Sequence, residues 1–378
     1  MKKYLVLLMA VFAASNVFAQ FKPGNIAVLR VGDGSSSMST SCAVSLLEYT
    51  TAGMSVGDPI AIPSETAGKR LVLDVGGSTE YSQLRLSANG QYLSFVGNDT
   101  TLGLMPNAAA TKVIARVGVN KVVDLTTNFL MPKGASVRGA VSDDGSNFWV
   151  NNSNGQMGFL YVPYGNSALA NPGYAVVNTN NYRSAQIYNN ELYALNGGGY
   201  NLCLLGAGSL PNAKTAPTTT IAMPDLAVPA SSVCFYLFDQ STKEPGLDVA
   251  YIFDGNGNTP YPTKAGNNML RKFCKVAGTW QETGAIEVKN FGEAPPSRPD
   301  LLRDLTGEIG SDGKVTLYAI RGVNTNSTLV AFKDASGYNG TLTEAAVTFK
   351  SLANAGTNYA FKGVALTPAA KGGKPAKK

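Results

Sequence analysis

A hairpin-like stretch returns at intervals along this chain. In its clearest form, residues 137–152 (VRGAVSDDGSNFWVNN), it reads as an apolar strand, a tight Asp-Gly turn and a second strand with aromatic residues. Related stretches lie at 84–99, 185–198 and 305–322. An internal period of this kind decides the architecture, because each unit is one supersecondary element that packs against its neighbours. The repeat therefore restricts the fold more than any other feature does.

The repeat units each hold about four short strands, separated by turn residues such as Asn-Gly and Asp-Gly. Such turns require positive backbone torsions and are typical of antiparallel hairpins. Four antiparallel strands, repeated along a chain, are the pattern of a β-propeller blade. The sequence therefore predicts an all-β chain folded as a β-propeller. The units begin, at spacings of roughly 45 to 70 residues, near Tyr81, Ser136, Tyr182, Ser232, Asp304 and Tyr359.

The two ends of the chain complement each other. Residues 359–368 (YAFKGVALTP) look like the first strand of a blade, and only a short tail follows them. Near the N-terminus, NIAVLRVGDG, AVSLLEYTTAG and DPIAIPS look like the other three strands. A blade shared between the termini would close the ring and remove its exposed edges. We expect six four-stranded blades, one of them composite, although the long interval from Ser232 to Asp304 leaves room for a seventh.

Three of the hairpins carry a recognisable pattern. They are SANGQYLSFV (87–96), SDDGSNFWV (142–150) and SDGKVTLYAI (311–320). In these stretches the chain resembles the secreted bacterial propellers of the NHL-like and YncE-like kind, whose blades carry an S-x-D/N-G-x-x-L/F-Y/W-V hairpin. The resemblance covers nearly all of the mature chain. It implies a propeller with a central pocket and does not imply a reaction.

The N-terminus has the features of a bacterial signal peptide. Two lysines precede an apolar run, and Val17-Phe18-Ala19 forms an Ala-x-Ala-like cleavage site. The apolar run is shorter than the roughly 18 residues that a membrane span needs. We expect residues 1–19 to be removed after Ala19, leaving a periplasmic or secreted protein with no membrane span.

The excess of positive charge lies at the two ends of the chain. The formal net charge is +6, and only 15% of residues are charged. The body of the protein, residues 20–368, is therefore close to neutral and is expected to form one domain that does not bind nucleic acid. Residues 369–378 are expected to form a disordered basic tail. The lysines at the ends are Lys2, Lys3, Lys371, Lys374, Lys377 and Lys378.

Histidine is absent, which removes the usual general base and the usual zinc ligand. The four cysteines (Cys42, Cys203, Cys234 and Cys274) show no CxxC spacing, so a zinc or redox site is poorly supported. In an oxidising compartment a disulfide is possible, with two of Cys203, Cys234 and Cys274 as the favoured pair. Buried free thiols are the alternative.

One stretch partly matches a calcium-binding loop. Asp254, Asn256 and Asn258 follow the D-x-N-x-N opening of such a loop. Thr259 then stands where the glycine of the sharp turn belongs, and Ala265 where the bidentate glutamate belongs. A Ca²⁺ site and an ordinary loop between strands are both compatible with this stretch. No catalytic residue is assigned, because the carboxylates show no spacing that would pair them for acid–base chemistry.

Two classes of function remain. The first is a non-catalytic binding or scaffold module, acting as a monomer, that holds a protein, peptide or glycan partner. The second is a hydrolase or lactonase-like enzyme in which Asp, Asn and Glu hold a divalent metal ion in the central channel.

A candidate ligand site follows from the repeat register. Arg138, Arg183 and Lys362 lie at the start of three inner strands, and Arg85 and Arg303 lie nearby. Cations gathered in a narrow funnel are tolerated more easily when carboxylates or an anionic ligand balance them. We expect this rim to bind an anionic ligand, such as a carboxylated sugar or an acidic peptide. The alternative is that each base pairs with a carboxylate of an adjacent blade, such as Asp304 or Glu308.

Overall fold

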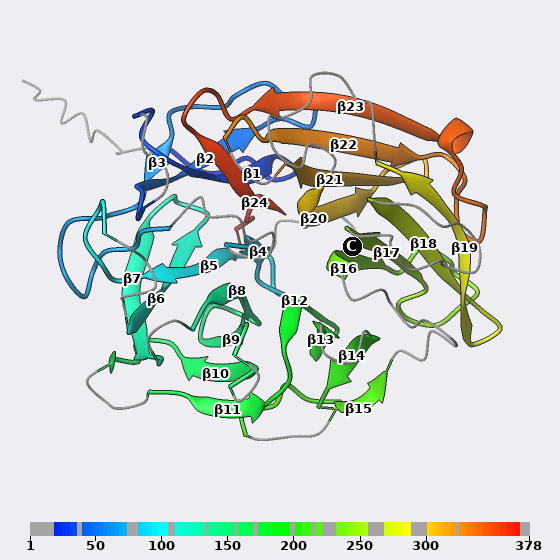
Figure 1. The fold of residues 1–378 in the computed structure, drawn as a ribbon. Helices are drawn as coiled ribbons and strands as arrows, with labels where there is room; N and C mark the ends of the chain where they lie inside the picture. The colour runs from blue at the N-terminus through cyan, green and yellow to red at the C-terminus, as the bar shows by residue number, and fades with distance from the viewer. Residues whose placement is uncertain are drawn as a thin grey trace, which may run out of the picture.

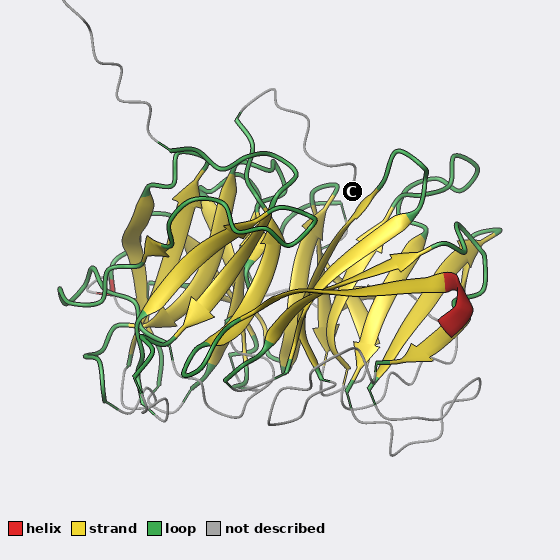
Figure 2. Ribbon diagram, turned by 90° about the horizontal axis from the view of Figure 1, so that it is seen from above, coloured by secondary structure: helices red, strands yellow, loops and turns green. Residues whose placement is uncertain are grey.

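The part of the chain described by the computed structural model folds into six four-stranded antiparallel sheets, arranged as blades around a central axis (Figure 1). Figure 2 shows the strands running between the two faces of this ring, with loops on both faces. The prediction of a six-bladed β-propeller is thus confirmed. The described residues are 19–35, 40–73, 82–104, 110–132, 135–154, 157–168, 173–196, 201–206, 208–213, 217–220, 232–255, 268–288, 301–322 and 325–370.

The blades are numbered around the ring, and their strands are given from the inner to the outer edge. Blade 1 contains β24 (Ala360–Leu366), β1 (Ile26–Val31), β2 (Val44–Tyr49) and β3 (Ile60–Ala61). Blade 2 contains β4 (Arg85–Leu86), β5 (Tyr92–Asn98), β6 (Thr111–Gly118) and β7 (Val123–Leu130). Blade 3 contains β8 (Val137–Ser142), β9 (Asn147–Asn152), β10 (Phe159–Pro163) and β11 (Ala175–Asn178).

The second half of the ring is built in the same way. Blade 4 contains β12 (Tyr182–Tyr188), β13 (Glu191–Asn196), β14 (Asn201–Leu205) and β15 (Pro217–Thr220). Blade 5 contains β16 (Ser232–Phe238), β17 (Val249–Asp254), β18 (Met269–Val276) and β19 (Thr279–Glu287). Blade 6 contains β20 (Leu302–Ile309), β21 (Val315–Arg321), β22 (Thr328–Asp334) and β23 (Val347–Asn354), preceded by the short 3-10 helix η3 (Glu344–Ala346).

Blade 1 joins the two ends of the chain, as predicted. β24 pairs with β1 from Ile26↔Leu366 to Val31↔Ala360. Beyond the strand, the Thr367 amide donates to the Asn25 carbonyl at 2.9 Å. The described residues of the interval from Ser232 to Asp304 form the single blade 5, and they contain no seventh sheet. The extra length of this interval falls on residues 256–267 and 289–300, outside the described residues.

One residue of the predicted tail, Ala369, has a place in the folded ring. Ala369 is buried, and its amide donates to the Gly90 carbonyl at 2.9 Å, so this residue belongs to the folded ring. The assignment of Ala369 to a disordered tail was therefore wrong. Residues 371–378, like residues 1–18 of the predicted signal peptide, lie outside the described residues.

The turns have the backbone torsions that their sequences require. Gly90, Gly145 and Gly313 end the Asn-Gly and Asp-Gly turns with φ of 73°, 87° and 73°. Asn189 and Asn190 have φ of 50° and 62°, the two positive values of a type I′ hairpin turn. Each turn reverses the chain between the inner strand and the next strand, which brings alternate apolar side chains onto the faces between blades.

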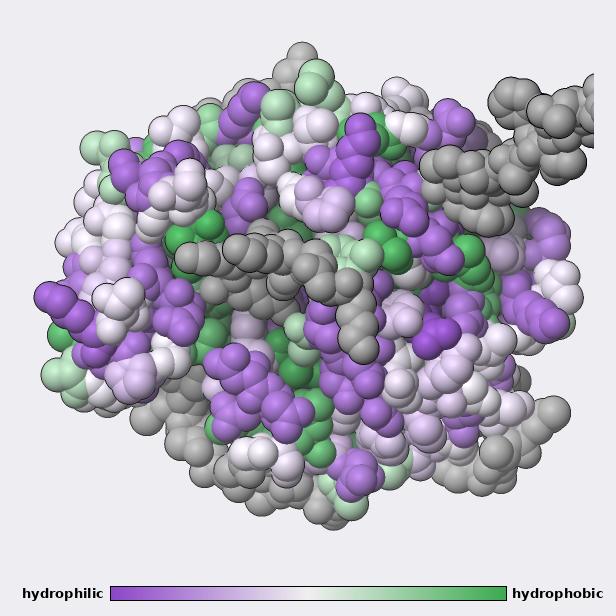
Figure 3. Space-filling model, turned by 180° about the vertical axis from the view of Figure 1, so that it is seen from behind, coloured by the Kyte–Doolittle hydropathy of each residue, from purple (hydrophilic) through white to green (hydrophobic). Residues whose placement is uncertain are grey.

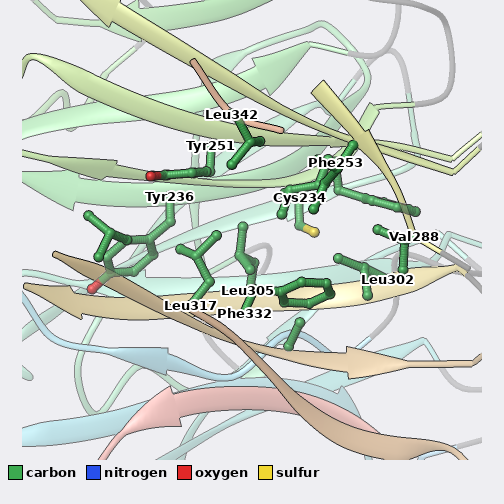
Figure 4. Packing of buried hydrophobic residues seen from close by; sticks show 14 of the residues in the cluster. Cys234, Tyr236, Tyr251, Phe253, Val288, Leu302, Leu305, Leu317, Phe332 and Leu342 are labelled. Atoms are coloured by element: carbon green, nitrogen blue, oxygen red, sulfur yellow. The ribbon is translucent and has the colours of Figure 1, made fainter. Parts of the chain in front are cut away.

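The core lies between neighbouring blades. At the interface of blades 5 and 6, Cys234 and Phe253 lie opposite Leu302 and Leu305, and all four are buried (Figure 4). Leu342, from the loop before η3, packs into the same cluster. Each blade is covered on both faces in this way, so its stability depends on its neighbours.

The turn glycines provide a matched test of this packing. A Cβ at Gly145 would lie 2.7 Å from the Tyr92 ring in the neighbouring blade, whereas a Cβ at Gly313 would meet no atom within 4 Å. Both residues have positive φ, so Ala costs about 1 kcal/mol at either position from backbone strain. We expect Gly313→Ala to lower the free energy of unfolding by that amount and Gly145→Ala by about 3 kcal/mol, because overpacking is added. Urea denaturation measures both, and equal losses would contradict the close contact with Tyr92.

Closure of the ring can be tested by truncation. Ending the chain after Asn358 removes β24 and exposes the edge of β1. We expect this variant to lose its cooperative thermal transition, because every blade relies on its neighbours. A chain ending after Ala370 keeps β24 and should melt like the full-length protein. A soluble, cooperatively melting product of the longer truncation would show that ring closure is not required.

Candidate functional site

The inner strands begin with a β-bulge at the same place in five blades. The pairing register shifts by one residue beside the second or third residue of each strand. A bulge leaves one residue outside the ladder and re-aims its side chain. Four of the five bulged residues are the predicted cations, and the fifth is valine: Arg138, Arg183, Val233, Arg303 and Lys362.

These cations are largely withdrawn from solvent. Arg303 and Lys362 are fully buried, Arg138 is buried and Arg183 is half-buried. The Arg138 guanidinium donates to the Tyr182 carbonyl at 2.7 Å and to the side chain of Asn181. It therefore ties blade 3 to the start of blade 4.

Arg85 has a different position and a different role. It lies two residues beyond the level of the bulges and is 1% exposed. Its Nη1 is 2.7 Å from Oδ1 of Asp304, which belongs to blade 6, with blade 1 between the two. Nε donates to the Ala185 carbonyl at 2.8 Å, and Nη2 to the Ser184 hydroxyl at 3.0 Å, both in blade 4. This side chain thus links blades 2, 4 and 6 near the ring axis.

Asp304 accepts several hydrogen bonds in addition to that of Arg85. Its Oδ2 accepts from the backbone amides of Leu84 and Val364 at 3.1 and 3.0 Å. These amides belong to the inner edges of blades 2 and 1. Burial raises the pKa of Asp304, and Arg85 and the amide donors offset only part of that effect. The ion pair therefore positions four blades while carrying a large desolvation cost.

Two polar residues of this region were missed by the sequence analysis. Gln83, at the start of blade 2, and Asn151, in β9, are fully buried, and their amide groups have no hydrogen-bond partner among the described residues. Both lie against Gly139, where a Cβ would be 3.0 Å from Oε1 of Gln83 and from Oδ1 of Asn151. Gln83 stands four residues before the turn serine Ser87, as Arg138 stands before Ser142. Strict alignment of the repeats could have found it.

The partial calcium motif falls only partly within the described residues. Asp254 is buried at the end of β17, and its carboxylate lies 3.4 Å from Nη2 of Arg271. Asn256 and Asn258 lie outside the described residues, so a Ca²⁺ ion at this loop stays a prediction. Within the ranges that the structure describes, no group of three or more Cys, Asp or Glu side chains could hold a metal ion.

The cysteines are buried thiols in the structure. Cys42, Cys203, Cys234 and Cys274 are each buried, and no disulfide joins the candidate residues Cys203, Cys234 and Cys274. Burial raises the pKa of Cys203 to about 11 and also raises the pKa of Cys274. Such thiols are poor nucleophiles at neutral pH.

No protein-family model and no curated protein sequence matches the chain. Among solved structures, a protein from Lactobacillus plantarum is similar at 10% identity and a TM-score of 0.44, over 90% of this chain and 98% of that one. Chaetomium thermophilum Sqt1, bound to the N-terminus of the ribosomal protein L10, is similar at 10% identity and a TM-score of 0.38, over 83% and 73%. The WD40 β-propeller domain of Doa1 is similar at 11% identity and a TM-score of 0.31, over 83% of this chain and 97% of that one. Across such structures the match covers between 60% and 98% of the other chain. This likeness is one of fold alone.

The outer surface is mixed in character. Figure 3 shows hydrophilic residues spread over the face opposite that of Figure 1, with hydrophobic residues visible nearer its middle. In the described part of the chain, no helix has the length and apolar character that crossing a bilayer would need.

The Arg85–Asp304 pair can be tested by a double-mutant cycle. Asp304→Asn leaves a buried guanidinium without its counter-charge, and we expect it to lower the free energy of unfolding by about 4 kcal/mol. Arg85→Met leaves a carboxylate that the backbone amides still bind, and we expect a loss of about 2 kcal/mol. The double variant should be about 2 kcal/mol more stable than the sum of the single losses predicts. Urea denaturation of the four proteins measures this coupling, and strict additivity would rule out a direct ion pair.

Proposed function

We propose that this protein is a secreted or periplasmic, non-catalytic binding module that holds an anionic ligand at the rim of its central axis. One observation carries the proposal: the charge of the six inner strands. They contain five cations and two carboxylates, which gives +5 − 2 = +3. The body of the protein as a whole is close to neutral. The positive charge therefore gathers where the blades converge.

The arrangement of these cations supports recognition of an anion. They come from separate blades, and four of them occupy bulges, which fix the direction in which a side chain leaves its strand. One of the two carboxylates, Asp304, pairs with Arg85, and the other, Glu308, accepts the Tyr318 hydroxyl at 2.7 Å. Guanidinium groups form paired hydrogen bonds to carboxylates, so a carboxylated sugar or an acidic peptide fits this rim.

The cellular location belongs to the same proposal. The charged N-terminus, short apolar run and Ala-x-Ala-like site support export, and the hairpin pattern resembles that of secreted NHL-like and YncE-like propellers. In such a compartment the ligand would be extracellular or periplasmic material rather than nucleic acid.

Arg183 offers the cleanest test, because it is half-buried and its loss costs less stability than the loss of a fully buried cation. The probes are oligogalacturonate and an oligoglutamate peptide, with neutral maltohexaose as a negative probe. We expect Arg183→Gln to raise the Kd of the anionic probe about tenfold, the loss of one charge-assisted contact. Lys333→Gln, an equal charge change on the exposed surface of blade 6, should leave the Kd unchanged.

Calorimetric titration at low and moderate salt measures these constants. Binding should weaken as salt rises, because the attraction is screened. If neither anionic probe binds the wild-type protein, or if both variants bind equally well, the rim does not recognise anions.

A further inference from the structure

A second feature lies at the outer rim, between blades 5 and 6. The loop that leaves β22 crosses to the outer edge of β19 before it turns back into η3 and β23 (Figure 1). There the Leu342 amide donates to the Thr283 carbonyl at 3.0 Å, and Leu342 forms a parallel bridge with Gly284. Gly284 has φ of 141°, and a Cβ on it would lie 2.5 Å from the Leu342 carbonyl oxygen. Only glycine allows this close contact.

A buried polar network fixes the base of the loop. Lys272 is fully buried, and its Nζ donates to Asp334 at 2.9 Å, to the Ser336 hydroxyl at 2.8 Å and to the Gly337 carbonyl at 2.6 Å. The Tyr251 hydroxyl donates to the same carboxylate at 2.6 Å. Burial alone would raise the pKa of Asp334, but hydrogen bonds from Ser336, Tyr251 and Lys272 outweigh it and lower the pKa. These hydrogen bonds fix the base of the loop in position.

The loop and β19 line a groove of about 870 Å³, formed by residues 281–285 on one side and by Asn339 and 341–345 on the other. Its volume is in the range of small-ligand and peptide pockets. The lining includes two glutamates and no lysine or arginine. The groove is therefore negatively charged, opposite in sign to the inner strands.

Glu282 places an incompletely satisfied carboxylate in this groove. Its side chain is only 7% exposed, and Oε1 lies 3.2 Å from Nη1 of Arg271. Arg271 also contacts Asp254 at 3.4 Å, so one guanidinium stands between two carboxylates. Oε2 of Glu282 has no hydrogen-bond partner among the described residues. An acceptor left unpaired in this way costs free energy that a ligand donor would recover.

We propose that this groove binds an extended peptide segment through a basic side chain that donates to Oε2 of Glu282. β19 is the last strand of its sheet, and within the described chain the bridge at Gly284 is its only outer pairing. A peptide laid along the remaining edge adds main-chain hydrogen bonds, while a pocket for one side chain gives specificity. Glu344, an exposed residue of the groove lining, adds to its negative charge. The site is distinct from the proposed anion site and does not depend on it.

The test uses two heptapeptide libraries that differ only at the central residue, which is arginine in one and its neutral isostere citrulline in the other. Fluorescence anisotropy with the full-length protein should show at least tenfold tighter binding of the arginine library. Glu282→Gln should abolish this preference, whereas Glu65→Gln, an equal charge change on the exposed surface of blade 1, should preserve it. Equal binding of both libraries, or a preference that survives Glu282→Gln, would overturn the proposal.

A blocking variant and a competition measurement test whether the peptide binds in the groove itself. Thr341→Lys places an ammonium group in the groove from an exposed position and leaves Glu282 and its neighbours intact, so it should block the arginine library without affecting the melting temperature. Retention of binding by this variant would contradict the site. Acetyl-arginine amide should compete at least tenfold more weakly than the library. Equal competition would mean that the groove takes a small cation, and the peptide proposal would be wrong.

Discussion

The pairing of β24 with β1 is the constraint on which the other contacts depend. Without it the blades form an open chain of sheets with two exposed edges, and the inner strands have no fixed distance from the axis. With it, the residues of β20 lie within reach of β4, although blade 1 separates them. The ion pair between Arg85 and Asp304 exists only because the ring is closed. The hydrogen bonds that Asp304 accepts from the amides of Leu84 and Val364 then hold the closing blade in position.

A buried ion pair at this place is better explained by geometry than by stability. The raised pKa of Asp304 shows that its charged form remains costly despite Arg85 and the amide donors. An apolar pair could be as stable, but it would not select which inner strands approach one another. Directional hydrogen bonds from Arg85 reach Ser184 and Asp304 in different blades at once. These hydrogen bonds define how blades 2, 4 and 6 converge. The same convergence sets the position of the cations at the bulges.

The fold could be predicted because its determinants are local. Asp-Gly and Asn-Gly turns, such as those ending at Gly145 and Gly90, set each hairpin within a few residues of sequence. The inner strands and their cations followed from aligning those turns. The partners could not be predicted in the same way, because Arg85 and Asp304 are brought together by closure of the whole ring. The contact of Leu342 with the edge of β19 likewise has no local signature in the sequence, apart from the glycine at position 284.

The near-neutral charge of the body hides two local charges of opposite sign. The inner strands carry an excess of cations, and the groove beside β19 contains glutamates without a lysine or arginine. Because blade 5 lies between these regions, the width of a four-stranded sheet separates the two sets of charges. Net charge describes solubility and long-range attraction, whereas recognition depends on the field within a cleft. A propeller can keep two regions of opposite charge apart, because the inner and outer edges of each blade lie on opposite sides of a sheet four strands wide.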